Sequence, residues 1–437
     1  MRISNPMNRI LLCFWLLSGL GLQRAYAQST PSQKLENMLG DQSFFANHPT
    51  GFVLYDLEQQ QVVYEKNSHQ YFAPASTTKL LTFYAALVTL GDSTKRLRYI
   101  PRGKDLLIWG TGDPGWGYQA LPQMNMKEFF APYQKIYFSD ANWQDSAYGY
   151  GWQWDDYNYA YAAERSSFPI YGNLVKVSSP NGRPQISPRY FENSLTPTQK
   201  AIKDIERNFH QNLYYYNPTV YRASTKPEYI PFVTSTETFA LLASEELGKE
   251  VIPSKEKLPE THFVLPGIPM DSLYKEMLQE SDNFIAEHLL MMVSDELLLK
   301  LESAEVIAHL KESLYADMPD ELLWFDGSGL SRYNLFTPRS MVNLAEKIYH
   351  IVPDTTLFRL LPTGGRSGTL KNVYKAASPY IFAKTGTFSN NHSLVGYIKT
   401  RNGKLYAFAF MNNNFPYKAR TVITEMEKVL SYIRDNY

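Results

Sequence analysis

The chain has 437 residues, 44% of them hydrophobic, and its 43 basic residues equal its 43 acidic residues in number. This length exceeds what one ordinary hydrophobic core supports and predicts two or three domains. The balanced charge gives no indication of a nucleic-acid partner. The single cysteine, Cys13, lies in an N-terminal leader, so neither a disulfide nor a thiolate metal site is expected in the mature chain.

Residues 1–27 have the features of a secretory signal peptide. Two arginines flank a polar start, an apolar run covers 10–22, and an Ala-Tyr-Ala cleavage site ends at Ala27. The apolar run is too short to span a bilayer. We therefore expect an exported protein without a stable membrane anchor.

The first folded elements are a β-hairpin over 50–66 and a helix over 75–90, as the alternation of apolar residues and then their helical spacing predict. The helix carries Ser76 and Lys79. Residues three apart lie on one helical face, so the Lys79 amine can reach the Ser76 hydroxyl and pair a base with a nucleophile. Ser76 falls in the first turn, where unpaired N–H groups favour a developing oxyanion.

The S-x-x-K spacing alone is weak evidence, because Ser254 and Ser272 also have a lysine three residues later. Ser254 lies in a charged connection between two prolines. Lys275 has Glu276 beside it, which would keep its amine protonated. For any single copy, an ordinary helix cap is the alternative interpretation.

The segment 94–264 is predicted to be mainly β, with short apolar strands broken by glycine and proline. Its centre, 148–161, is dense in tyrosine and tryptophan. Such a tract would either stack on sugar faces or pack strands and a domain interface. A helix is predicted over 196–212, because three apolar residues repeat there at helical spacing.

Helices are then predicted over 271–280 and from residue 284 onward, with Ser281, Asp282 and Asn283 between them. If this loop faces the nucleophile, its hydroxyl could relay a proton and its amide could hold a substrate amide. A helix cap is the alternative role of Ser281.

Two later stretches carry further candidates. A glycine-rich loop over 324–334 contains Arg332, whose planar guanidinium could clamp a carboxylate. Three antiparallel strands are predicted over 381–388, 394–400 and 405–411, and a closing helix over 421–434. The first strand bears Lys-Thr-Gly-Thr at 384–387, a fixed cation followed by a glycine that permits a close approach to the backbone.

Three short motifs thus occur in order on suitable elements: S-x-x-K at Ser76, S-D-N at Ser281 and K-T-G at Lys384. This triplet is the signature of class A β-lactamases and penicillin-binding proteins. More narrowly, the chain resembles the penicillin-binding D-alanyl-D-alanine carboxypeptidase/endopeptidase family, which has a large insertion between the first two motifs. The residues that carry the resemblance are 74–76, 112–114, 151–156, 281–283, 326–332 and 384–387.

The resemblance implies an α+β fold of the serine β-lactamase/transpeptidase type, an antiparallel sheet flanked by helices. Residues 28–93 and 265–437 would form this catalytic domain, and 94–264 would be the inserted domain. The stretch between the first two motifs is shorter than usual for the family. Whether the insertion contains a small nested third domain therefore stays open.

The resemblance also implies roles in catalysis. Ser76 would attack the carbonyl between two D-alanines after a neutral Lys79 takes its proton, and Ser281 would pass that proton to the departing D-alanine. Burial and the charge of Lys384 would both keep Lys79 neutral. No metal or other cofactor is implied.

The implied binding residues come from the second and third motifs. Asn283 would hold the peptide amide, while Lys384 and Thr385 would bind the terminal carboxylate. Gly386 would allow the close approach, and the N–H of Thr387 would complete an oxyanion hole with that of the nucleophile.

The implied partners are peptidoglycan stem peptides ending in D-Ala-D-Ala and β-lactam antibiotics. Asp156, with Tyr161 and Arg332 nearby, would contact the ammonium of the stem diamino acid. An acid that follows a tryptophan could equally cap a turn.

Two other functions are weighed against this one. A β-lactamase would need a dedicated deacylation base, and no Glu-x-x-Leu-Asn occurs between Ser281 and Lys384. A non-catalytic peptidoglycan-binding or scaffold protein of the cell envelope is the alternative from another class, and the intact motifs argue against it.

Overall fold

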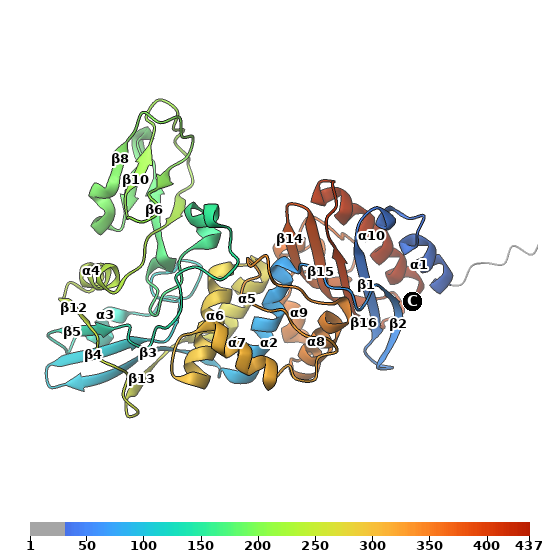
Figure 1. Ribbon diagram of the computed structural model, residues 1–437, viewed down its shortest axis with the longest axis horizontal. Coiled ribbons are helices and arrows are strands. Elements are labelled where there is room, and N and C mark those ends of the chain that lie inside the picture. Colours follow the sequence, from blue (N-terminus) through green and yellow to red (C-terminus); the bar gives the residue numbers. More distant parts are fainter. Residues whose placement is uncertain (1–30) are drawn as a thin grey trace, which may run out of the picture.

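The computed structural model describes residues 31–437. The predicted signal peptide, 1–27, lies outside this range. Figure 1 shows an elongated molecule with the sheet that bears β14 at one end and the inserted strands at the other, joined through a group of helices. Among the described residues, no helix is long and apolar enough to cross a bilayer.

The first sheet is fully antiparallel and pairs its N-terminal strand β1 with its C-terminal strand β16. Its strand order is β14-β15-β16-β1-β2, and residue Thr50 of β1 pairs with Asn412 of β16. The strands are β1 (Thr50–Asp56), β2 (Gln61–Lys66), β14 (Ile381–Phe388), β15 (Asn391–Lys399) and β16 (Leu405–Asn412). The predicted hairpin and the three predicted C-terminal strands are confirmed.

Alternating residues of this sheet face two different cores, as the period of a β-strand requires. Phe52 and Phe408 pack with α1 (Pro31–Leu39) and α10 (Ala419–Asn436) on one side. Val53 and Ala407 pack with the other helices on the opposite side. This is the predicted antiparallel sheet with helices on both faces.

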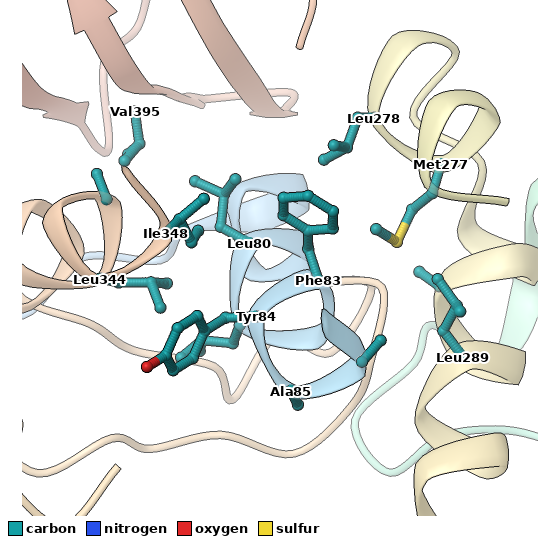
Figure 2. Packing of buried hydrophobic residues seen from close by; sticks show 14 of the residues in the cluster. Leu80, Phe83, Tyr84, Ala85, Met277, Leu278, Leu289, Leu344, Ile348 and Val395 are labelled. Atoms are coloured by element: carbon teal, nitrogen blue, oxygen red, sulfur yellow. The ribbon is translucent and has the colours of Figure 1, made fainter. Parts of the chain in front are cut away.

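The helices of the second layer surround α2 (Lys79–Thr89), whose residues 79–86 are all buried and mostly apolar. In Figure 2, Leu80, Phe83 and Tyr84 leave α2 in different directions. Phe83 packs edge-on against Tyr274, with ring centroids 5.1 Å apart. The surrounding helices are α5 (Met270–Gln279), α6 (Asn283–Leu298), α7 (Ser303–Glu312), α8 (Pro338–Ile351) and α9 (Asp354–Leu360).

The segment between α2 and α5 forms a second, mixed sheet with its own core, in the order β12-β5-β4-β3-β13. Its first and last strands along the chain, β3 and β13, pair antiparallel. The strands are β3 (Ser93–Arg102), β4 (Asp105–Gly110), β5 (Ile136–Ser139), β12 (Val251–Ser254) and β13 (Phe263–Pro269), accompanied by α3 (Met126–Phe130) and α4 (Thr236–Leu247).

Two small three-stranded sheets extend from this region, with orders β11-β6-β7 and β8-β10-β9. They form the green projection of Figure 1. Their strands are β6 (Leu174–Ser178), β7 (Gln185–Ser187), β8 (Leu195–Pro197), β9 (Glu206–Arg207), β10 (Tyr214–Tyr216) and β11 (Glu228–Pro231).

The predicted helix over 196–212 is wrong. The chain there forms β8, a bend and β9, and both strands pair with β10. Arg207, which a helix would have placed on its polar side, is buried, and its guanidinium donates to the Tyr148 hydroxyl at 2.9 Å. Of the three apolar residues predicted to be buried, Ile202 and Ile205 are buried and Phe209 is 38% exposed, so tertiary pairing overrides the local helical spacing.

Candidate active site

Ser76 lies in a tight turn at the start of the central helix. The turn is the 3₁₀ segment η2 (Ala75–Thr78), which continues directly into α2. Ala75 has a φ of +48°, a conformation that costs energy for a residue with a side chain and often marks a functional site. Lys79 Nζ lies 3.0 Å from Ser76 Oγ and can donate to it, as the spacing predicted.

Strand β14 is held against this turn by a glycine. A Cβ placed on Gly386 would lie 2.1 Å from the carbonyl oxygen of Pro74 and 3.0 Å from the nitrogen of Ser76. Only a residue without a side chain fits there. This glycine lets β14 lie against the turn that carries Ser76, and Ser76 and Thr387 line the same cleft.

Lys79 is fully buried and has three oxygen partners. Besides Ser76, its Nζ donates to Asn283 Oδ1 and to the carbonyl of Ser328, each at 2.6 Å. Burial lowers the pKa of Lys79 to about 8, although the nearby Asp326, Asp282 and Glu287 carboxyl groups oppose the shift. A buried lysine with such a pKa can be neutral near physiological pH and act as a base.

The S-D-N loop faces the nucleophile from α6. Asp282, rather than Ser281, caps this helix, since its side chain accepts from the Ile285 N–H at 2.9 Å. The alternative role of Ser281 as a cap is therefore wrong. Ser281 has a φ of +61°, and its hydroxyl accepts from Lys384 Nζ at 2.8 Å.

Lys384 is buried behind the exposed surface of β14. Its Nζ donates to the Ser281 hydroxyl and, at 2.8 Å, to the carbonyl of Thr385. Burial lowers the pKa of Lys384 well below its usual value, and the charge of Lys79 lowers it further. Thr385 Oγ1 donates to Thr369 Oγ1 at 2.9 Å.

The aromatic tract approaches the site through Asn283, whose Nδ2 donates to the carbonyl of Tyr161 at 3.0 Å. The Tyr161 hydroxyl donates to Asp156 Oδ1 at 2.8 Å. Arg332 lies with its guanidinium 3.7 Å from the centre of the Phe388 ring and bonds to Gln153. Asp156 and Tyr161 also interact electrostatically with Arg332, so the three sequence-predicted rim residues lie near one another.

Much of the same tract packs against protein. Tyr150 stacks on Tyr333 with centroids 5.0 Å apart, and Trp152 Nε1 donates to Asp326 Oδ2 at 2.9 Å. The interpretation of the tract as an interface is confirmed for Trp152. Tyr150 stays 65% exposed despite its stacking, and Trp154 is 77% exposed.

A buried polar network beneath Lys79 escaped the sequence analysis. Glu287 on α6 accepts from the Ser328 N–H at 2.7 Å and forms an ion pair with Arg165 at 3.3 Å. Burial and the neighbouring Asp326 raise the pKa of Glu287 to about 7. The signal was a glutamate on the apolar face of a predicted helix, which requires a buried partner.

A cleft of about 420 Å³ opens beside the nucleophile. Ser76, Ser281, Thr385 and Thr387 line one part of it, so both serine hydroxyls and the outer face of β14 are accessible from the same space. The buried ammonium groups lie behind these hydroxyls.

A serine beside a buried lysine of lowered pKa, a second serine bonded to a second lysine, and a strand pressed against the nucleophile turn are the parts of an acyl-transfer site. On this α+β framework they define a serine enzyme of the penicillin-binding class. The sequence pattern of the D-Ala-D-Ala carboxypeptidase 3 (S13) family matches residues 32–205 and 248–433. The chain belongs to this family of serine-type D-Ala-D-Ala carboxypeptidases.

Individual relatives agree with this assignment. The chain is 24% identical over 410 residues to the D-alanyl-D-alanine carboxypeptidase DacB of Haemophilus influenzae, covering 84% of this chain and 85% of that one. It is 26% identical over 426 residues to the D-alanyl-D-alanine carboxypeptidase of Actinomadura, covering 83% and 77%.

Solved structures share the fold. The crystal structure of penicillin binding protein 4 from Haemophilus influenzae has a TM-score of 0.73 at 20% identity, with 92% of this chain and 99% of that chain covered. A predatory endopeptidase from Bdellovibrio bacteriovorus, solved with an immunity protein, has a TM-score of 0.51 at 15% identity and covers 88% and 93%.

Proposed function

We propose that this chain hydrolyses peptidoglycan stem peptides ending in D-Ala-D-Ala through an acyl-enzyme on Ser76. The observation that carries the proposal is the contact of Ser76 Oγ with the buried Lys79 amine at 3.0 Å. The family assignment and the two carboxypeptidase relatives support the reaction type. The same acyl-enzyme would serve a cross-linked peptide, in keeping with the endopeptidase that shares the fold.

In the proposed reaction, neutral Lys79 removes the proton of Ser76 as its oxygen attacks the carbonyl of the penultimate D-alanine. The N–H groups of Ser76 and Thr387 stabilise the oxyanion, where one such donor is typically worth about 10²–10³-fold in rate. Ser281, bonded to Lys384, passes the proton that Lys79 took from Ser76 on to the departing amine. Water then attacks the ester and releases the shortened peptide and free Ser76.

Binding residues follow from the same geometry. Asn283 uses its Oδ1 on Lys79 and its Nδ2 on Tyr161, so holding a substrate amide would require a shared or displaced bond. Thr385, with Lys384 behind it, is proposed to bind the terminal carboxylate, and Gly386 keeps the strand close. The substrate places this activity outside the cytoplasm, and the proposed signal peptide would export the chain to the periplasm.

The decisive experiment is incubation of the purified mature chain with benzylpenicillin, followed by intact-protein and peptide mass spectrometry. We expect one adduct per chain and, in parallel, release of D-alanine from a pentapeptide substrate. Neither adduct nor D-alanine from a folded protein would favour the scaffold function. Rapid release of hydrolysed penicillin would favour a β-lactamase.

Asp156 is proposed to bind the side-chain ammonium of the stem diamino acid, because its carboxylate is fixed by Tyr161 at the rim of the site. Replacing Asp156 with asparagine should lower kcat/KM for a stem peptide with a free side-chain ammonium by roughly 10-fold, the value of one charged hydrogen bond. Activity on the same peptide with that amine acetylated should change little. If the parent protein and the Asp156→Asn variant were equally active on the charged peptide, Asp156 would not be the residue that binds the ammonium.

A further inference from the structure

The cleft beside Ser76 has a second side that the three motifs do not form. It is lined by Thr369, Asn372, Tyr374, His392 and Arg420, which come from the loop before β14, from β15 and from the first turn of α10. Of the described residues that line the cleft, none is an aspartate or glutamate, and Arg420 is the only lysine or arginine.

Arg420 is an exposed cation without a protein partner in the described part of the chain, and its position in α10 does not stabilise the helix. Its side chain is exposed, and its guanidinium makes no hydrogen bond or ion pair with another described residue. It lies in the first turn of an 18-residue helix, where the helix dipole disfavours a cation. A charge at a place that costs stability and faces a cleft points to a ligand of opposite charge.

Two residues on the same side of the cleft have a buried polar atom without a partner in the described structure. The hydroxyl of Tyr374 and Nε2 of His392 are buried and have no hydrogen-bond partner among the described residues. Tyr374 and His392 are 1% and 2% exposed. Burial raises the pKa of Tyr374 and the nearby Arg420 charge opposes this rise, which puts the two side chains in the same electrostatic environment. Both atoms are closed off from the cleft, so the charged group that this side presents to a ligand is the exposed Arg420 guanidinium.

The other cations near the nucleophile are less available to a ligand. Lys79 and Lys384 are buried and already donate to protein oxygens. Burial holds the pKa of His392 at about 4, so this side chain is neutral at physiological pH. The exposed positive charge of the cleft is therefore that of Arg420.

We propose that Arg420 is a specificity-determining residue that binds a carboxylate of the leaving group. This inference rests on the proposed function, since it assigns the far side of the cleft to the part of the peptide that departs from the acyl-enzyme. Guanidinium groups bind carboxylates through two parallel hydrogen bonds. Thr385 would contact the same end of the peptide from β14.

The test measures binding apart from catalysis. In the full mature chain carrying Ser76→Ala, calorimetry gives Kd values for diacetyl-L-lysyl-D-alanyl-D-alanine and for the same peptide as its C-terminal amide. We expect the peptide acid to bind more tightly than the amide. Arg420→Gln should raise the Kd of the acid by roughly 10- to 100-fold, the range for a charged hydrogen bond. Binding of the amide should change less than about twofold.

Two further variants separate a contact from a structural effect. Arg420→Lys keeps the charge and should restore part of the preference for the acid. Lys418→Gln removes an exposed charge two residues earlier, outside the cleft lining, and should leave both Kd values unchanged.

The inference is overturned if Arg420→Gln raises the Kd of the acid and of the amide equally, or raises neither. It is also overturned if the parent protein binds the acid and the amide with the same Kd. Failure of the proposed function has a different signature. The chain with Ser76 intact would then form no penicillin adduct and release no D-alanine, whatever the outcome of the binding measurements.

Discussion

Ser76→Ala is expected to abolish the covalent penicillin adduct and to lower D-alanine release by at least about 10⁴-fold, as is usual when a catalytic nucleophile is removed. Among the described residues, only the Ser76 hydroxyl both lies 3.0 Å from a buried lysine and belongs to a turn against which Gly386 of β14 packs. Alanine is a good helix former, and Ser76 is half-buried, so the thermal midpoint should stay within a few degrees. Adduct formation is measured by intact-protein mass spectrometry.

The chain provides its own control for this prediction. Ser254 also precedes a lysine by three residues, but its hydroxyl lies at the end of β12 and accepts only from the Glu256 N–H, at 3.3 Å. Ser254→Ala should therefore leave the adduct and the D-alanine release unchanged. A stoichiometric adduct on the Ser76→Ala protein would mean that another residue is the nucleophile.

The rate of acylation is expected to rise as the pH increases through about 8. In the Lys79→Gln variant this pH dependence should disappear. The base must be neutral to accept the Ser76 proton, and burial lowers the pKa of Lys79 to about 8. Below that pH the neutral fraction falls tenfold per unit, so the rate at pH 6 should be roughly 100-fold below the plateau. Lys79→Gln should reduce acylation by about 10²–10⁴-fold at pH 8, the usual contribution of a general base.

The pH profile distinguishes a base from a structural cation. If Lys79 served only to hold Asn283 and the Ser328 carbonyl, its protonated form would act better, and the rate would fall as the pH rises through 8. Lys275→Gln, in the S-x-x-K at Ser272, is the matched control and should keep both the rate and the profile. Stopped-flow measurement with a chromogenic β-lactam gives the rates.

The elements around the nucleophile could be predicted because local pattern and tertiary structure agree there. The predicted helix over 271–280 corresponds to α5, and the predicted closing helix to α10. The three C-terminal strands were found by their alternation and by the turn at Asn402 and Gly403. Over 196–212 the local pattern and the tertiary structure disagree, because pairing with β10 and burial of Arg207 outweigh the helical spacing of the apolar residues.

The motif residues could be identified from the sequence, but their second partners could not. The Ser328 carbonyl beside Lys79 and the Thr369 hydroxyl beside Thr385 belong to loops that approach the site only in the folded chain. Every residue has a backbone carbonyl, so the residue types alone cannot indicate which one contacts Lys79. Arg420 escaped notice for a related reason, because an arginine in the first turn of an amphipathic helix looks like ordinary surface.

The pairing of β3 with β13 has a consequence for how this chain can vary. Ser93 pairs with Pro269 across these strands, and the Met270 N–H donates to the Asp92 carbonyl at 3.0 Å. The whole segment between them leaves and rejoins the remaining chain at a single point, the arrangement in which insertions and exchanges of domains are tolerated. The outer strands of that segment can therefore lengthen or shorten while α2 and α5 keep their spacing, provided that Arg165 keeps its ion pair with Glu287 and Tyr161 its hydrogen bond with Asn283.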